Sequence, residues 1–141
     1  MANTTAVSVQ FKVDSMTAIL PAAISTLKAA LYLASATTNG DNTAYTATGE
    51  SSGTGYTAGG VAVTAATAPS ASGTHAIWTP TASIVFSTIT PPSAVDAIMI
   101  YDTARSNKAI GVWNFGSQTI TAGTLTLTMP VNAVGTALLQ C

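Results

Sequence analysis

Few side chains in this sequence are suited to acid–base or nucleophilic chemistry. The 141 residues include five acidic side chains, four basic ones, one histidine and one cysteine. General acid–base catalysis needs titratable groups held at hydrogen-bond distance from a substrate. The single histidine, His75, follows the turn-forming pair Gly73-Thr74 and cannot supply a pair of metal ligands. We therefore expect His75 to be a strand-end residue, and we expect no enzyme activity, no catalytic residue, no metal site and no cofactor.

Two segments rich in turn-forming residues match no ligand-binding pattern. Asn39-Gly40-Asp41-Asn42 carries oxygen ligands suited to calcium, but it lacks the spaced acidic residues and final glutamate of an EF-hand. The run from Gly49 to Gly60 contains Gly53-Thr54-Gly55, but no Gly-Lys-Ser/Thr sequence of a phosphate-binding loop follows it. We interpret the first segment as a turn and the second as a flexible or extended loop.

Charge is scarce along the whole chain. Charged residues make up 6% of the sequence, against about 25% in a typical soluble domain, and the formal net charge is −1. Such a chain generates little field to attract nucleic acid or an anionic membrane. The low charge favours a surface that is buried in an assembly, where unpaired ions are costly. The alternative is a threonine-rich soluble domain with no special partner.

The sequence predicts neither a leader nor a membrane-spanning segment. The stretch from Met16 to Ala36 resembles a signal sequence, but no basic region precedes it and Lys28 interrupts it. The uncharged run from Ser15 to Leu27 is too short to cross a bilayer. The only cysteine, Cys141, cannot form a disulfide within the chain, although one between copies is conceivable.

Short strands separated by turns are expected throughout. Apolar residues alternate with polar ones from Val7 to Val13, which is typical of a half-buried strand. The run from Ala94 to Tyr101 is mostly apolar and suits a strand buried on both faces. A polar hairpin turn from Asp102 to Lys108 then leads into a strand from Ala109 to Phe115.

This spacing of strands and turns predicts an all-β fold, a single antiparallel β-sandwich or jelly-roll-like domain with extended loops and termini. The domain is expected to span residues 1–141, with a possible N-terminal arm at 1–5 and a C-terminal extension at 131–141. Nine residues are expected in its core: Phe11, Leu31, Leu33, Val85, Ile98, Ile100, Trp113, Leu125 and Leu127.

Four residues are candidates for an interface with another chain. Tyr45 and Tyr56 lie in the polar, glycine-rich region and are candidates for exposed anchors at an interface, although packing inside the chain is the more common role of such residues. Leu138 and Leu139 belong to an apolar chain end that is expected to be exposed unless a neighbour covers it. Extended loops and termini of this kind can add backbone hydrogen bonds at the sheet edge of another subunit.

Six segments between residues 28 and 130 stand out by their order and spacing, and these are Leu31–Thr37, Thr43–Glu50, Ser52–Gly60, Ala97–Asp102, Asn107–Ile110 and Phe115-Gly116. Together they resemble a family of small tailed-bacteriophage virion structural proteins. This resemblance implies a structural protein of the virion, bound to copies of itself and to the major capsid protein or another virion protein, and the favoured role is that of a capsid cement or decoration protein. It also implies a place in the virion, which is assembled in the cytoplasm of the host bacterium.

Two alternatives to a capsid role remain. A neck, collar or tail subunit of the same virion fits the same composition. A receptor- or carbohydrate-binding module would need exposed aromatic residues beside clustered Asp, Asn or Arg, and the sequence offers few such clusters. No partnership with nucleic acid or with a membrane is expected.

Overall fold

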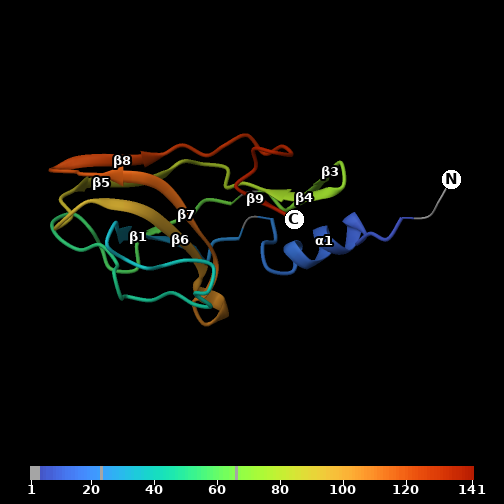
Figure 1. Cartoon of the computed structure of the whole chain (residues 1–141), viewed down its shortest axis with the longest axis horizontal. Coiled ribbons are helices and arrows are strands. Elements are labelled where there is room, and N and C mark those ends of the chain that lie inside the picture. Colours follow the sequence, from blue (N-terminus) through green and yellow to red (C-terminus); the bar gives the residue numbers. More distant parts are fainter. Residues whose placement is uncertain (1–3, 23, 66) are drawn as a thin grey trace. The chain divides into compact units, whose positions relative to one another are not determined.

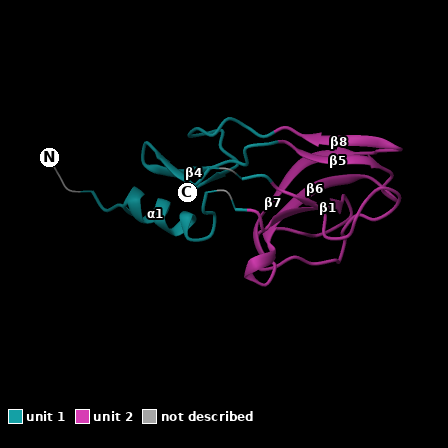
Figure 2. Ribbon diagram, turned by 180° about the vertical axis from the view of Figure 1, so that it is seen from behind, with its two compact units in different colours: residues 1–24, 64–82, 129–141 teal, residues 25–63, 83–128 magenta. Residues whose placement is uncertain are grey.

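The computed structural model describes residues 4–22, 24–65 and 67–141, and this part of the chain is mostly β-structure (Figure 1). Strands account for 40% of the residues and helix for 9%, and all the sheets are antiparallel, so the prediction of an all-β fold is confirmed. The chain divides into two compact units (Figure 2). Unit 1 comprises Met1–Ile24, Thr64–Ala82 and Met129–Cys141, and unit 2 comprises Ser25–Val63 and Ser83–Thr128. The expectation of one domain over residues 1–141 stays a prediction.

Unit 2 contains two antiparallel sheets that form a β-sandwich-like pair of layers (Figure 1). The four-stranded sheet has the order β2-β1-β6-β7, and the two-stranded sheet pairs β5 with β8. Their bounds are β1 Leu27–Leu33, β2 Val61–Ala62, β5 Ile84–Ile89, β6 Val95–Asp102, β7 Lys108–Gln118 and β8 Gly123–Leu127.

The two central strands of the larger sheet, β1 and β6, are buried on both faces. In β6 every residue except Asp96 is buried, which confirms the prediction for this run. Because side chains alternate between the faces of a strand, Ile98 and Ile100 lie on one face, while Met99 and Tyr101 lie on the other. The second face forms a core cluster in which Ala30, Tyr32, Met99 and Tyr101 are all buried.

A tight connection joins β6 to β7 where the polar turn was predicted. Asp102 ends β6, and its carboxylate accepts hydrogen bonds from the Ala104 amide at 2.9 Å and the Thr26 hydroxyl at 2.7 Å. It thereby caps the 3-10 helix η1 (Thr103–Arg105). Asn107 then takes a left-handed conformation with φ +57°, which asparagine tolerates better than most residues.

The smaller sheet corrects part of the predicted core. Ile84, Phe86 and Ile89 are each 1% exposed, whereas Val85 is 39% exposed and points away from the core. The prediction for Val85 was wrong because a continuous apolar run does not reveal which alternate residues face inward. The predictions for Leu31, Ile98 and Ile100 are confirmed, since all three are buried. The other predicted core residues of unit 2 are half-buried, and these are Leu33, Trp113, Leu125 and Leu127.

Unit 1 begins with a helix where a strand was predicted. Helix α1 spans Val9–Thr17, so the strand from Val7 to Val13 is wrong. The spacing of Val9, Val13, Met16 and Leu20 fits one side of a helix, and along this series the residues pass from half-buried to fully buried. The apolar residues of this segment fit both the alternation of a strand and the spacing of a helix. Only the helix, together with the turn that follows Thr17, buries Met16 and Leu20.

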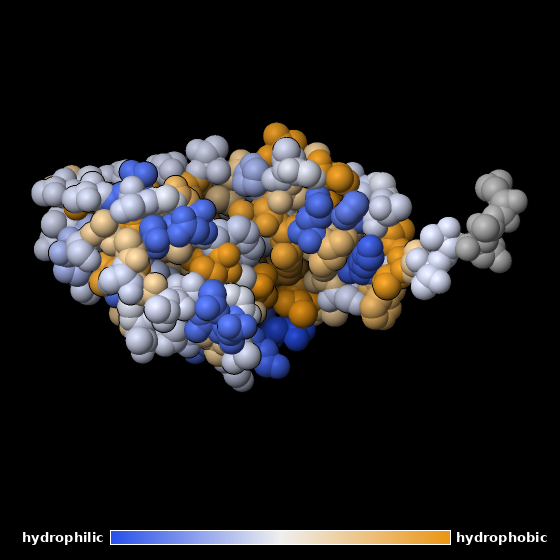
Figure 3. All heavy atoms as spheres, viewed as in Figure 1, coloured by the Kyte–Doolittle hydropathy of each residue, from blue (hydrophilic) through white to orange (hydrophobic). Residues whose placement is uncertain are grey.

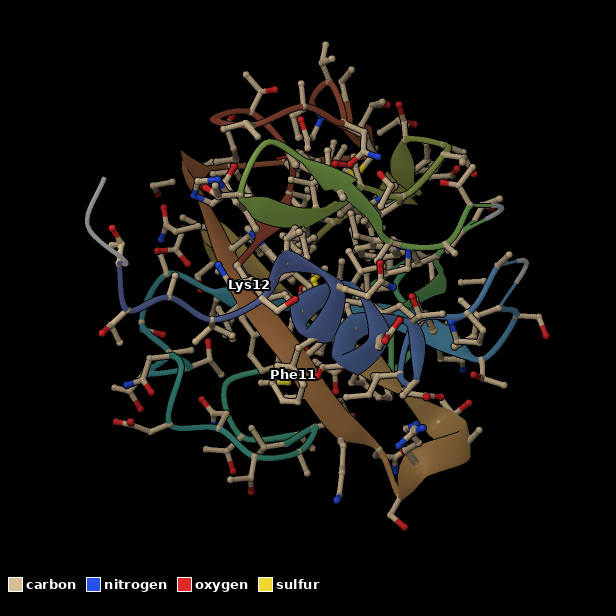
Figure 4. The ribbon with its side chains drawn as sticks, turned by 90° about the vertical axis from the view of Figure 1, so that its right-hand side faces the viewer. Phe11 and Lys12 are labelled. Carbon is tan, nitrogen blue, oxygen red and sulfur yellow. The ribbon has the colours of Figure 1, made fainter. Side chains whose placement is uncertain are left out.

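The predicted core position of Phe11 is also wrong for this reason. Phe11 lies on the outer side of α1 and is 65% exposed, and Figure 4 shows it leaving the helix on a different side from Lys12. The Lys12 ammonium group donates to the Thr74 carbonyl oxygen at 3.1 Å, which ties α1 to the turn between β3 and β4. The predicted arm at residues 1–5 lies mostly outside the described residues, and Thr4 and Thr5 have no regular secondary structure.

The rest of unit 1 is a small three-stranded sheet with the order β3-β4-β9. Its strands are β3 Ser70–Ser72, β4 His75–Trp78 and β9 Leu139–Gln140. The indole of Trp78 is fully buried. Within the predicted C-terminal extension at 131–141, strand β9 therefore belongs to the fold of this unit.

Two adjacent residues of β5 provide a test of this packing. Phe86→Ala should lower the free energy of unfolding by about 3–5 kcal/mol, because it leaves a cavity in the core. Val85→Ala should cost less than about 1 kcal/mol, because Val85 is partly solvated. Urea denaturation of both variants measures the difference, and equal costs for the two would contradict the observed register of β5.

Candidate functional site

All four tyrosines of the chain gather around one carboxylate, that of Glu50. Glu50 lies in a short segment that pairs with the edge of β1, opposite Tyr32. The Leu33 amide donates to the Gly49 carbonyl oxygen at 3.0 Å, and the Ser51 amide donates to the Leu31 carbonyl oxygen at 2.7 Å. These backbone hydrogen bonds hold Glu50 beside the sheet independently of the contacts that its side chain makes.

The Glu50 carboxylate accepts three hydrogen bonds. The Tyr45 hydroxyl donates to Oε2 at 2.5 Å, while the Tyr56 hydroxyl and the Gly59 amide donate to Oε1 at 2.7 and 2.6 Å. The Tyr56 oxygen in turn accepts from the Leu31 amide at 3.0 Å. Donors of this kind stabilise a half-buried carboxylate without a cation.

The other two tyrosines tie the same loop to the sheet from β1 and β6. The Tyr101 hydroxyl donates to the Gly59 carbonyl oxygen at 2.7 Å, and the Tyr32 hydroxyl donates to the Thr46 carbonyl oxygen at 2.7 Å. The rings of Tyr45 and Tyr101 stack with their centroids 4.8 Å apart. We call Glu50, Gly59 and the four tyrosines the Glu50 network.

Glycine is required where this loop returns to the sheet. Gly60 has φ +79°, and a Cβ at this position would lie 1.8 Å from the Ala29 carbonyl oxygen. Only a residue without a side chain permits so close an approach to β1. The glycine-rich composition of Gly49–Gly60 therefore serves close packing against the sheet, and the predicted extended loop is held in place along much of its length.

Burial raises the pKa of each tyrosine in the network. The pKa of Tyr32 is raised to about 12, mainly by loss of solvation, with a smaller contribution from the charge of Glu50. Burial first and the Glu50 carboxylate second raise the pKa of Tyr45, and the same two causes raise the pKa of Tyr56 and Tyr101. At neutral pH these hydroxyls are hydrogen-bond donors, and they are poor candidates for proton transfer.

Two of the predicted interface residues, Tyr45 and Tyr56, belong to this network. Both are half-buried, and both hydroxyls are engaged inside the chain. Each residue is partly exposed as a whole, and the role of both at an interface stays a prediction. Sequence reasoning missed Glu50 itself, although it is the only acidic residue between Asp41 and Asp96 and has a tyrosine on either side.

The other two predicted interface residues lie at the end of unit 1. Leu139 pairs with Trp78 in the β4–β9 ladder, and the Leu138 amide donates to the Thr79 hydroxyl at 3.0 Å. Cys141 exchanges backbone hydrogen bonds with Ala76 at 3.0 and 3.1 Å. Both leucines are half-buried, so the chain itself covers part of the apolar surface that was expected to be exposed.

The remaining sequence candidates have structural roles. His75 begins β4, as expected of a strand-end residue. In the predicted turn, Asn39 Oδ1 accepts from the Asp41 amide and Asn42 Oδ1 accepts from the Asn39 amide. The turn is thus confirmed, and these two side-chain oxygens already have partners.

One catalytic spacing was overlooked in the sequence. Gly49-Glu50-Ser51-Ser52-Gly53 has the G-x-S-x-G pattern of a nucleophile elbow, which normally lies between a strand and a helix. Here it lies in the loop beside β1, with no helix after it. Ser51 is 4% exposed, and its hydroxyl makes a long hydrogen bond of 3.5 Å to the Ser52 carbonyl oxygen. This geometry does not present a nucleophile to a substrate.

Among the residues that the structure describes, no three His, Cys, Asp or Glu side chains are grouped to hold a metal ion. Within the same ranges, no helix has the length and apolar character needed to cross a membrane. No protein-family model, curated protein or solved structure matches the chain.

A matched pair of charge-removing substitutions tests the Glu50 network. Glu50→Gln removes the charge and places an amide NH₂ group, itself a donor, where the carboxylate accepts hydrogen bonds. Hydrogen bonds to charged groups contribute about 1.5–3 kcal/mol each. We expect the free energy of unfolding to fall by about 2 kcal/mol and hydrogen exchange to accelerate in residues 45–60. Asp41→Asn removes the same charge from an exposed turn and should change stability by less than about 0.5 kcal/mol. Similar effects of the two would contradict the role assigned to Glu50.

Alkaline titration gives a second test of the network. Because the folded-state pKa of Tyr32 is about 12, above its ordinary value of 10.0, the neutral hydroxyl stabilises the fold. This contribution is fully present below pH 10 and is lost as the pH rises through about 12. Tyrosinate absorbance and circular dichroism should therefore change together in this range. Ionisation of all four tyrosines near pH 10 with an intact fold would rule out the network as described.

Proposed function

We propose that this chain is a non-enzymatic structural subunit of a tailed-phage virion. In this proposal it is a capsid cement or decoration protein that stabilises the head shell. It binds copies of itself and the major capsid protein through apolar and neutral-polar contacts. The resemblance of residues 28–130 to small virion proteins supports the assignment, and the character of the surface supports the mode of binding.

The observation that carries the proposal is how little charge the surface presents. The chain has only four basic and five acidic residues. Two of the acids are occupied within unit 2, because Asp102 is 1% exposed and Glu50 accepts three hydrogen bonds. Asp96 accepts a further hydrogen bond, from the Asn114 side chain at 3.0 Å. Few charges are therefore left to make salt bridges with another subunit.

Apolar side chains take their place at the surface. Val7, Phe11 and Val131 are each more than 60% exposed, and Figure 3 shows apolar residues among the surface atoms, with hydrophilic residues in small separate groups. Single exposed apolar residues are normal on any protein surface, but these side chains are available for burial by another subunit. Burial contributes about 25 cal/mol per Å² of apolar area, whereas an exposed ion pair contributes only about 0–1 kcal/mol. Apolar burial is thus the larger source of binding energy available to this surface.

Washing purified particles in salt tests this proposal. At about 1 M NaCl the Debye length falls to about 3 Å, so contacts that depend on exposed charges weaken, whereas apolar burial does not. We expect most of the protein to stay on the particles, as measured by quantitative mass spectrometry of the pellet. Release by salt alone, or absence of the chain from the particles before the wash, would contradict the proposal.

A further inference from the structure

Strand β7 is a long edge strand, and the described strands pair with it on one side only. It has 11 residues, against eight in β6, the strand with which it pairs. On the outer edge, only its first residues are paired, since Lys108 bridges Ala44 and the Ala109 amide donates to the Thr43 carbonyl oxygen at 3.1 Å. Beyond Ala109, no described segment forms a strand pair with this edge. Backbone donors and acceptors along such an edge form a template for another strand.

The sequence of this strand lacks the residues that usually prevent strand addition. Between Ala109 and Gln118 there is no charged residue and no proline, and these are the commonest protective devices on edge strands. Two β-bulges interrupt the pairing with β6, but the stretch Gly111–Asn114 between them pairs in regular register with Ile100, Met99, Ile98 and Ala97. Asn114 is the exposed residue of this stretch, and its side chain donates to Asp96 at 3.0 Å and accepts from the Gly116 amide at 2.9 Å.

A second copy of the same strand is the partner that this edge fits best. When two identical strands pair antiparallel, a residue near the start of one strand lies opposite a residue near the end of the other. Lys108, the only charged residue of β7, therefore lies opposite the neutral far end of the other copy rather than opposite a second lysine. Like charges are kept apart, and only neutral side chains meet near the centre of the pair.

We propose that the outer edge of β7, from Ile110 to Phe115, pairs antiparallel with the same edge of a second copy of this chain. The two four-stranded sheets then form one continuous sheet across a two-fold axis near Val112 and Trp113. This proposal rests on the proposed function, since it identifies the contact between copies in the assembly. Pairing between copies would account for a long edge strand that lacks the charged residues and prolines that usually prevent strand addition.

Hydrogen exchange of the unmodified chain tests this pairing directly. Pairing gives the outward-facing amides of β7 new acceptors, so they become protected when the chains associate. We expect peptides covering 110–115 to exchange about tenfold more slowly in concentrated than in dilute samples, with recovery on dilution. Peptides covering β8 provide the internal control and should not change. Protection confined to any other segment, or a chain that stays monomeric at every concentration, would overturn the proposal.

Cysteine cross-linking provides a second measurement in a Cys141→Ser background. Asn114→Cys should be joined efficiently by a short bis-maleimide, because it lies within a few residues of the proposed two-fold axis. Thr126→Cys, an equally exposed position in β8, should react only at the rate of random collision. Equal yields for the two variants would contradict the pairing.

The two proposals fail in different ways. Absence of the chain from purified virions would overturn the virion function and leave the exchange result unaffected. A chain that is abundant in particles but lacks protection of β7 would retain the function and lose this contact.

Discussion

The structure of unit 2 depends on one requirement: a sheet that is apolar on both faces must be covered on both. Residues of β1 and β6 are buried on each side, so neither face can be left to solvent without exposing several large side chains. The β5–β8 sheet supplies one layer, and the loop that contains Tyr45 packs on the other, over Tyr32 and Met99. The loop has no regular secondary structure of its own over most of this course. Its position must therefore come from contacts with the sheet.

The Glu50 network provides those contacts. A single carboxylate collects donors from Tyr45, Tyr56 and Gly59, and Tyr101 binds the same glycine from the sheet. In a chain with so few charges, one half-buried carboxylate organises much of the loop, and close backbone packing at Gly60 completes its course. The tyrosines are thereby engaged largely in holding the fold together, which leaves neutral-polar and apolar residues to face outward.

The sequence predicted those parts of the fold that depend on local pattern. The apolar run of β6 and the polar turn after it were identified correctly, because each is set by neighbouring residues. Helix α1 was missed because the apolar residues between Val7 and Val13 satisfy two periodicities at once. The exposure of Val85 could not be read from an uninterrupted apolar run, in which either set of alternate residues can face the core.

The Glu50 network could not be predicted from the sequence, for a different reason. Its members are separated by up to about seventy positions, from Tyr32 to Tyr101, and only strand pairing brings them together. The isolated position of Glu50 in an uncharged stretch was the available signal. By contrast, the expectation of neutral contact surfaces came from composition alone, and it stays a prediction.

The central claim is that this chain is a structural subunit whose neutral, apolar surface is covered by copies of itself and by a larger shell. The most direct test is to measure its abundance in purified virions relative to the major capsid protein, by quantitative mass spectrometry. A capsid cement protein is expected in a ratio comparable to that of the shell subunits. A small fixed ratio would instead identify a neck, collar or tail subunit and contradict the capsid role. Absence from the particle would contradict the whole account.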